Sequence, residues 1–183
     1  MANKVKIFIS STMEELQEER KAVAKAIRET PYRDREPIMA EDYPASSNSP
    51  RNICLEKVRE CKIYVGIFKE KYGYIPEINN PEQLSVTALE YREARKHNLT
   101  ILIFIDATYN SRRENRLEAF LSHICNFDSG HWRKQYSNTD ELVNLVLRGI
   151  ESDVTIIYNA SGQKTQDIYS LPYFTDKLKE KLK

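Results

Sequence analysis

Short apolar segments alternate with longer amphipathic segments along most of the chain. The short segments are rich in β-branched and aromatic residues, which predicts buried strands. They cover residues 4–10, 63–68 and 100–106, with a weaker strand over 36–41. The longer segments repeat their apolar residues at helical spacing, which predicts amphipathic helices. They cover residues 12–30, 51–61, 87–97, 116–124 and 140–150.

Strands and helices that alternate in this way form βαβ units, which predicts a parallel sheet with helices on both faces. The segment 131–136 is predicted to add a short edge strand, and 154–158 to pair as a further strand. The lysine-rich end, 173–183, is predicted to form a short helix. The predicted fold class is α/β, with one domain over 1–150 and a C-terminal extension, a tail or linker, over 151–183.

The composition is that of a globular protein and excludes several classes. The 183 residues are 40% hydrophobic, enough for a core of ordinary size. A protein that binds nucleic acid through bulk charge has a clear positive excess, whereas the net charge here is +1. No apolar run approaches the roughly 20 residues of a membrane span, and no signal segment opens the chain. We therefore expect a cytoplasmic protein without nucleic-acid or membrane partners.

The placement of cysteine and histidine gives no sign of metal chemistry. The three cysteines have no CxxC spacing, and the three histidines are scattered. The loop after the first strand also lacks the glycines of a P-loop or of a G-x-G-x-x-G motif. The sequence therefore predicts neither a bound metal ion nor a cofactor.

Polar residues follow the predicted strands, at the edge of the sheet where parallel α/β proteins bind their ligands. The candidate binding residues are Ser10, Ser11, Thr12, Glu41, Phe68, Tyr72, Gly73, Ser85 and Thr87. Among them, Phe68 and Tyr72 are the candidates for the wall of a base pocket. These residues come from four separate loops or helix starts, so we expect polar side chains to converge at this edge.

The hydroxyl residues 10–12 have two interpretations. Hydroxyl groups beside the free N–H groups of a helix start can bind a phosphate or a ribose. Alternatively, Thr12 and Glu15 form a T-x-x-E capping box, which has only a structural role. Further along the same predicted helix, Arg20 falls on the solvated face, although it is also placed to brace the first loop.

Glu90 is the candidate catalytic residue. If Thr87 caps the third helix, the Glu90 carboxylate only returns to the backbone of the cap. If the carboxylate instead points into a cleft, it can stabilise an oxocarbenium ion, bind ribose hydroxyls or attack an anomeric carbon. The sequence alone leaves both interpretations open.

Several short motifs together resemble one family, the domain of unknown function numbered 4062. The similarity covers about residues 4–105. It is carried by Val5-Lys6-Ile7-Phe8-Ile9-Ser10-Ser11-Thr12, Glu15-Leu16, Glu19-Arg20, Cys54-Leu55, Val58, Cys61, Tyr64-Val65-Gly66-Ile67-Phe68, Tyr72-Gly73, Ser85-Val86-Thr87 and Glu90-Tyr91.

This resemblance implies a three-layer, flavodoxin-like (TIR-like) sandwich with a sheet of about five mainly parallel strands. It also implies similarity to nucleoside deoxyribosyltransferases. TIR-type NAD hydrolases and those transferases use a glutamate at a helix start after the third strand, with a serine shortly before it. Glu90 and Ser85 fall at the matching places.

The function expected from the resemblance is cleavage of the N-glycosidic bond of NAD, or a related nucleotide, in defence or signalling. NAD would be a substrate, and no cofactor is implied. The alternatives are a non-catalytic interaction or oligomerisation module, or a receptor for a nucleotide signal. In these alternatives the domain would be attached to a larger signalling NTPase or would self-associate.

Overall fold

The computed structural model describes residues 4–30, 35–108 and 112–160, with side chains as far as residue 152. The chain divides into two units, Met1–Gly149 and Ile150–Lys183, and the sheet lies in the first unit. Its strands are β1 (Val5–Ser10), β2 (Arg35–Ile38), β3 (Ile63–Phe68), β4 (Thr100–Asp106) and β5 (Arg133–Tyr136). The helices are α1 (Gln17–Glu29), the 3-10 helix η1 (Ala40–Asp42), α2 (Pro50–Glu60), α3 (Val86–Lys96), α4 (Asn115–Ile124) and α5 (Thr139–Ala160).

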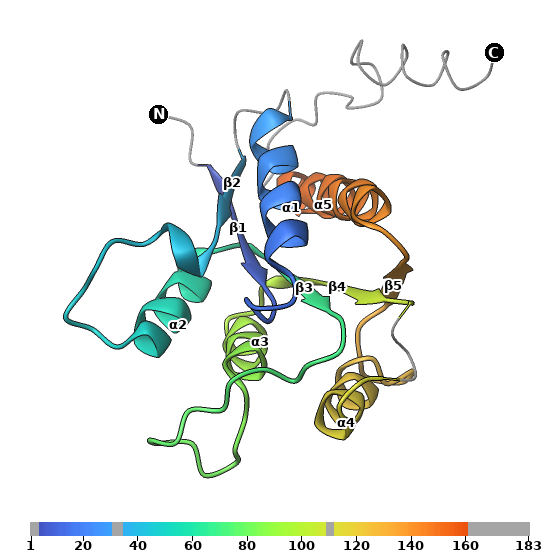
Figure 1. The fold of residues 1–183 in the computed structure, drawn as a ribbon. Helices are drawn as coiled ribbons and strands as arrows, with labels where there is room; N and C mark the ends of the chain where they lie inside the picture. Colours follow the sequence, from blue (N-terminus) through green and yellow to red (C-terminus); the bar gives the residue numbers. More distant parts are fainter. Residues whose placement is uncertain (1–3, 31–34, 109–111, 161–183) are drawn as a thin grey trace. The chain divides into compact units, whose positions relative to one another are not determined.

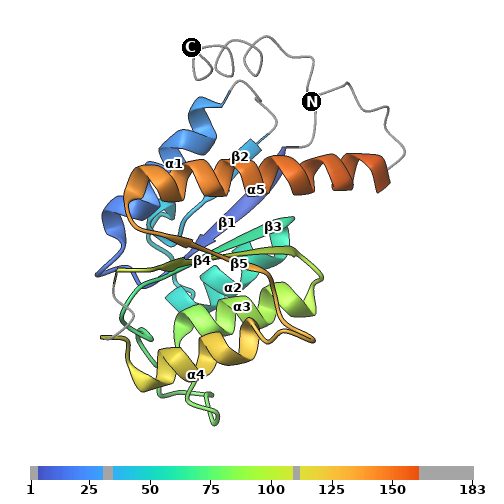
Figure 2. The same ribbon diagram turned by 90° about the vertical axis from the view of Figure 1, so that its right-hand side faces the viewer.

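The five strands are parallel and follow the order β2-β1-β3-β4-β5 (Figure 1). Helix α1 and the part of α5 within the first unit cover one face of the sheet, and α2, α3 and α4 cover the other (Figure 2). The direction in which strands are added reverses at β1, because β2 lies on one side of it and β3 on the other. Such a reversal opens a crevice at the carboxyl ends of the two strands beside it, here β1 and β3, and open α/β sheets bind ligands in this crevice.

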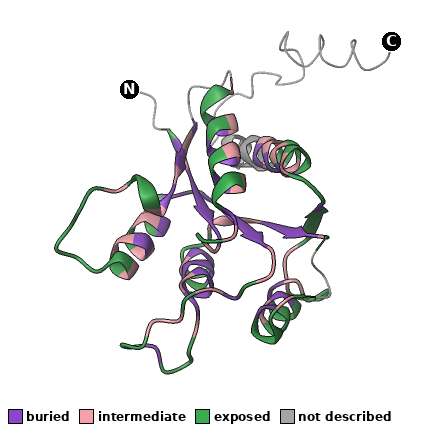
Figure 3. Ribbon diagram, viewed as in Figure 1, coloured by how far each residue is buried: buried purple, intermediate pink, exposed green. Residues whose placement is uncertain are grey.

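The sheet forms the centre of the core, as the concentration of buried residues in Figure 3 shows. Every residue of β3 is buried, as expected for a parallel strand covered on both faces. On the face of α2, α3 and α4, the strands contribute large side chains, among them Phe8, Tyr64 and Ile103. Burial of such side chains stabilises the fold by about 1.5–3 kcal/mol each. The core therefore holds β1 and β3 firmly at the edge where the polar loops begin.

The predicted α/β fold, with a parallel sheet and helices on both faces, is confirmed. Strands β3 and β4 have the predicted bounds because both are nearly continuous apolar runs between polar residues. The second strand is shorter than the predicted 36–41, since residues 40–42 turn into η1. The first helix begins at Gln17 and not at Thr12.

The prediction of a strand over 154–158 is wrong, because these residues continue α5. Apolar residues recur along α5 at helical spacing, and extending an existing helix is far easier than nucleating a new element. The predicted helix over 173–183 lies outside the described residues. Although α5 has 22 residues, neither it nor any other helix in the described ranges is long and apolar enough to cross a membrane.

Candidate functional site

A cleft of about 1060 Å³ adjoins the carboxyl end of β1 and the loop that follows β3. Its lining comes from residues of β1 and the loop after it, from the segment between η1 and α2 with the start of α2, from the loop after β3 and from the start of α3. Small-molecule sites usually have volumes of roughly 300–1,000 Å³. The cleft is therefore large enough for a ligand of nucleotide size or more.

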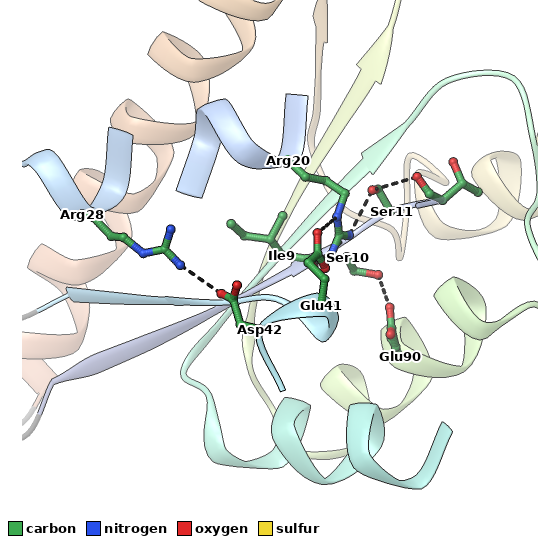
Figure 4. A network of polar contacts seen from close by, with 9 residues as sticks. Ile9, Ser10, Ser11, Arg20, Arg28, Glu41, Asp42 and Glu90 are labelled. Carbon is green, nitrogen blue, oxygen red and sulfur yellow. Dashed lines mark hydrogen bonds and ion pairs between the residues drawn. The ribbon is translucent and has the colours of Figure 1, made fainter. Parts of the chain in front are cut away.

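Glu90 reaches this cleft from the second turn of α3, and its side chain is almost fully buried. The Ser10 hydroxyl donates a hydrogen bond to the Glu90 carboxylate, with an Oγ–Oε2 distance of 2.5 Å (Figure 4). Burial raises the pKa of Glu90 to about 7, against the lowering effects of the Ser10 hydrogen bond and the Arg20 charge. The site therefore holds one carboxylate that exchanges its proton near neutral pH.

The capping interpretation of Glu90 is wrong, because Ser85 and not Thr87 is the N-cap of α3. The Ser85 hydroxyl accepts a hydrogen bond from the backbone N–H of Ala88 at 3.2 Å. Glu90 thus lies beyond the position that returns to a cap, and its carboxylate bonds to Ser10 on β1 instead. Thr87 lines the cleft, whereas Ser85 does not.

Arg20 is the largest fully buried side chain of the described residues, so its assignment to a solvated face is wrong. Its guanidinium donates to the Ile9 carbonyl at 3.3 Å and to the Ser11 hydroxyl at 3.1 Å. It also donates two hydrogen bonds to the Glu41 carboxylate, at 3.0 and 2.5 Å (Figure 4). Arg20 therefore braces the first loop, the other role that the sequence suggested.

Glu41 is the partner that compensates the buried Arg20 charge, and it does not line the cleft. Burial would raise the pKa of Glu41, but the hydrogen bond and charge of Arg20 outweigh it and hold that pKa below its usual value. Glu41 is thus an anion at neutral pH. It acts on the site through Arg20, which lies close enough to influence Glu90.

The predicted helix-start phosphate site at residues 10–12 is wrong in its geometry, because α1 begins only at Gln17. The predicted capping box is also wrong, because the Thr12 hydroxyl donates to the Glu15 carboxylate at 2.7 Å and Leu16 is the N-cap of α1, without a side-chain cap. The Glu15 carboxylate, however, accepts hydrogen bonds from the backbone N–H groups of Glu70 and Lys71. Glu15 therefore holds the loop after β3. Ser11 and Thr12 line the cleft from a turn, and Ser10 lies buried beneath it.

The loop after β3 brings Gly73 to the cleft but leaves Phe68 and Tyr72 in the core. Gly73 has a φ of 95°, and a Cβ atom there would lie 3.0 Å from Thr12 Cγ2, so the loop needs glycine. Phe68 and Tyr72 pack their rings on Phe120, with centroids 5.8 and 6.0 Å away. The prediction that these two rings line a base pocket is therefore wrong.

The segment between η1 and α2 forms a wall of the cleft that the sequence analysis missed. It contributes Tyr43, the adjoining start of α2 contributes Arg51 and Cys54, and Tyr74 adds an exposed ring from the loop after β3. The signal was present in the sequence, because this Pro- and Ser-rich loop follows the carboxyl end of the second strand. Cys54, predicted as a core residue, is buried but also borders the cleft beside Glu90.

In chemical terms, the cleft combines a buried carboxylate, a hydroxyl that orients it and nearby hydroxyl groups on the walls. Within the part of the chain that the structure describes, no three His, Cys, Asp or Glu residues are grouped to hold a metal ion. A single carboxylate of this kind can stabilise a positive charge that develops on a sugar ring, or attack the anomeric carbon. It can also bind ribose hydroxyls without reaction.

Several solved structures are similar to this chain. The CMP N-glycosidase BcmB of Clostridium botulinum is 14% identical, with a TM-score of 0.48, over 78% of this chain and 98% of that one. A 2-desoxiribosyltransferase from Leishmania mexicana is 16% identical, with a TM-score of 0.39, over 55% of this chain and 64% of that one. A conserved protein from Enterococcus faecalis is 11% identical, with a TM-score of 0.45, over 79% of this chain and 98% of that one. At these scores the similarity assigns neither a substrate nor a reaction.

Among curated proteins, no match was found. The family described as "Domain of unknown function (DUF4062)" matches residues 6–151. This range includes all of the sheet except Val5, the first residue of β1, and extends well past residue 105, where the resemblance in the sequence ended. It also contains every residue that lines the cleft. The chain belongs to the DUF4062 family.

Proposed function

We propose that the cleft cleaves the N-glycosidic bond of a nucleotide, with NAD or a related nucleotide as substrate and Glu90 as the catalytic carboxylate. One observation carries the proposal. Glu90 is buried at a large cleft, bonds to Ser10 at 2.5 Å and has its pKa raised to about 7. Carboxylates whose proton affinity is perturbed by burial cluster at functional sites.

The reaction requires little from the protein besides this carboxylate. The C1′–N bond breaks, and its electron pair leaves with the base nitrogen. A nicotinamide ring departs as a neutral base, because its nitrogen is cationic in the substrate. The Glu90 carboxylate stabilises the positive charge on the ribose or bonds to C1′. Water then attacks C1′, and any bond between C1′ and the Glu90 carboxylate breaks and returns its electron pair to that carboxylate. C1′ keeps the hydroxyl group and the second proton of the water is released.

Neighbouring residues support this role in different ways. Ser10 is a positioning residue, since its hydroxyl fixes one carboxylate oxygen of Glu90. Ser11 and Thr87 line the cleft, and their hydroxyl groups are candidates for binding the ribose hydroxyls. Tyr43 and Tyr74 replace Phe68 and Tyr72 as candidates for the base, because their residues border the cleft.

The proposal is tested by incubating the purified chain at high concentration with NAD and measuring released nicotinamide by chromatography. We expect turnover by the unaltered chain and a loss on the order of 10³-fold or more in Glu90→Gln. Glu93→Gln is the matched control, because Glu93 lies on the same helix and pairs with Arg59 outside the cleft. Thermal unfolding checks that each variant is folded.

Two outcomes would contradict the proposal. Turnover that persists in Glu90→Gln would exclude Glu90 as the catalytic group. Saturable nucleotide binding without any product would instead identify a receptor for a nucleotide signal, with the cleft as its binding site.

A further inference from the structure

Three of the charged side chains that line the cleft, those of Glu14, Arg20 and Lys71, are paired with an opposite charge. Arg20 pairs with Glu41, as described above. Lys71 pairs with Glu14, with an Nζ–Oε2 distance of 3.1 Å. The carboxylate of Glu114 accepts a hydrogen bond from the backbone N–H of Tyr72 at 2.9 Å. The ion pairs of Arg20, Lys71 and Glu14 leave little free charge for a ligand, whereas Glu114 is a carboxylate whose recorded hydrogen bond is to a neutral group.

Arg51 is different, because its hydrogen-bond partners among the described residues are neutral. Its guanidinium donates to the carbonyl oxygens of Ile78 and Asn79, at 2.8 and 3.2 Å. Its Nε atom is buried and has no hydrogen-bond acceptor within the described residues. Arg51 therefore places an uncompensated positive charge on the wall of the cleft.

The two carbonyl contacts also fix the orientation of the Arg51 side chain. They join the first turn of α2 to the loop before α3. A guanidinium held in this way has lost its rotational freedom before a ligand arrives, which lowers the entropic cost of binding. Arginine is the residue best suited to phosphate oxygens, since its planar fork donates several parallel hydrogen bonds.

Apolar residues share this wall of the cleft with Arg51. Pro44, Pro50 and Ile53 line the same wall as Tyr43. Electrostatic attraction is stronger beside such a wall than in open water, because the local dielectric constant is lower. The combination favours a ligand with an apolar ring and an anionic group close together, as a nucleotide has.

We propose that Arg51 is an anion subsite that holds a phosphate group of the substrate and makes the cleft select nucleotides over nucleosides. The inference rests on the proposed reaction at Glu90 and adds the substrate class and the residue that determines it. In this arrangement Glu90 acts on the bond that is cleaved, and Arg51 lies on the wall formed by α2 and the segment before it.

The test compares three substrates that share the same bond and the same leaving base. Nicotinamide riboside has no phosphate, nicotinamide mononucleotide has one, and NAD has a diphosphate. Of the two phosphorylated substrates, the one that is cleaved faster should have a kcat/KM about 10–100-fold higher than that of the riboside in the unaltered chain. This range follows because a hydrogen bond to a charged group contributes about 1.5–3 kcal/mol. Arg51→Gln should remove most of this preference, because it lowers kcat/KM for the nucleotides far more than for the riboside.

Two further variants separate charge from structure. Arg51→Lys keeps the charge without the fork, so it should retain part of the preference. Arg92→Gln is the matched control, because Arg92 pairs with Glu82 on the surface and does not line the cleft. Equal kcat/KM values for riboside and nucleotide in the unaltered chain would overturn the proposal, as would an equal loss on all three substrates in Arg51→Gln.

A binding measurement keeps the two proposals separable if no substrate is cleaved. ADP-ribose, adenosine and inorganic phosphate are titrated calorimetrically into the unaltered chain and into Arg51→Gln. Binding of ADP-ribose that weakens about 10-fold or more in Arg51→Gln would support the subsite even though the proposed reaction had failed. Binding of adenosine as tight as that of ADP-ribose would overturn the subsite. So would inorganic phosphate binding more tightly than the nucleotide.

Discussion

Replacing Glu90 by Gln should stabilise the folded chain at alkaline pH. A pKa of about 7 in the folded chain, against the ordinary value of 4.5, means that the native state binds an extra proton between these two pH values. Stability therefore falls as pH rises from about 4.5 to 7 and stays lower above that window. Gln has nearly the same shape but carries no charge, so the variant avoids this loss.

The magnitude follows from the same pKa values. Each tenfold change in proton affinity corresponds to about 1.4 kcal/mol, so ionising Glu90 in the folded chain costs about 3 kcal/mol above pH 8. At pH 5 the calculated cost falls below about 1 kcal/mol. In a chain of this size, the advantage of Glu90→Gln at pH 8.5 should raise Tm by roughly 6–12 °C.

The assay is urea unfolding of the unaltered chain and Glu90→Gln at pH 5 and 8.5, followed by circular dichroism. The decisive quantity is how much the stability difference between the two chains changes from pH 5 to pH 8.5. The contacts of the new amide are the same at both pH values, so they cancel in this comparison. Glu93→Gln provides a control of opposite sign, since the net effect of the charges around Glu93 lowers its pKa despite burial. A stability difference that does not change with pH, or a variant that is less stable only at pH 8.5, would refute the reasoning.

Three further changes test the surroundings of the site. Glu41→Gln leaves the Arg20 charge unpaired, so it should lower the free energy of unfolding by about 3 kcal/mol. The pH midpoint of turnover should also shift downward, because Glu41 raises the pKa of Glu90. Gly73→Ala should destabilise the chain by about 1–2 kcal/mol in urea titrations, given its positive φ. Glu15→Gln loosens the loop after β3 and should raise KM about fivefold in steady-state assays with little change in kcat.

The fold could be predicted from the sequence because its strongest signals are local. The apolar runs of β3 and β4 fix those strands, and the alternation with helices fixes a parallel sheet. The extension of α5 could not be predicted in the same way. Its β-branched residues at 154–157 favour a strand when considered alone, whereas the preceding turns of helix favour continuation.

Site residues could be predicted only where their position after a strand or at a helix start placed them at the ligand-binding edge of the sheet. The edge rule for parallel sheets led to Glu90 and Ser10, which the structure joins by a hydrogen bond. Arg20 was missed as a buried residue because its partner, Glu41, lies on another element and only folding brings the two together. Arg51 gave no signal in the sequence, since its partners are backbone carbonyls of a distant loop.

The wall between η1 and α2 has a consequence for how such a domain can diversify. Glu90 and Ser10 belong to a helix and a strand whose packing fixes them, whereas Tyr43 and the residues up to Ser49 belong to a surface connection. Connections of this kind tolerate insertions and substitutions far better than core elements do. Exchange of this one connection between relatives would therefore change what is recognised while the chemistry is inherited intact, and chimaeric chains offer a direct way to follow that evolution.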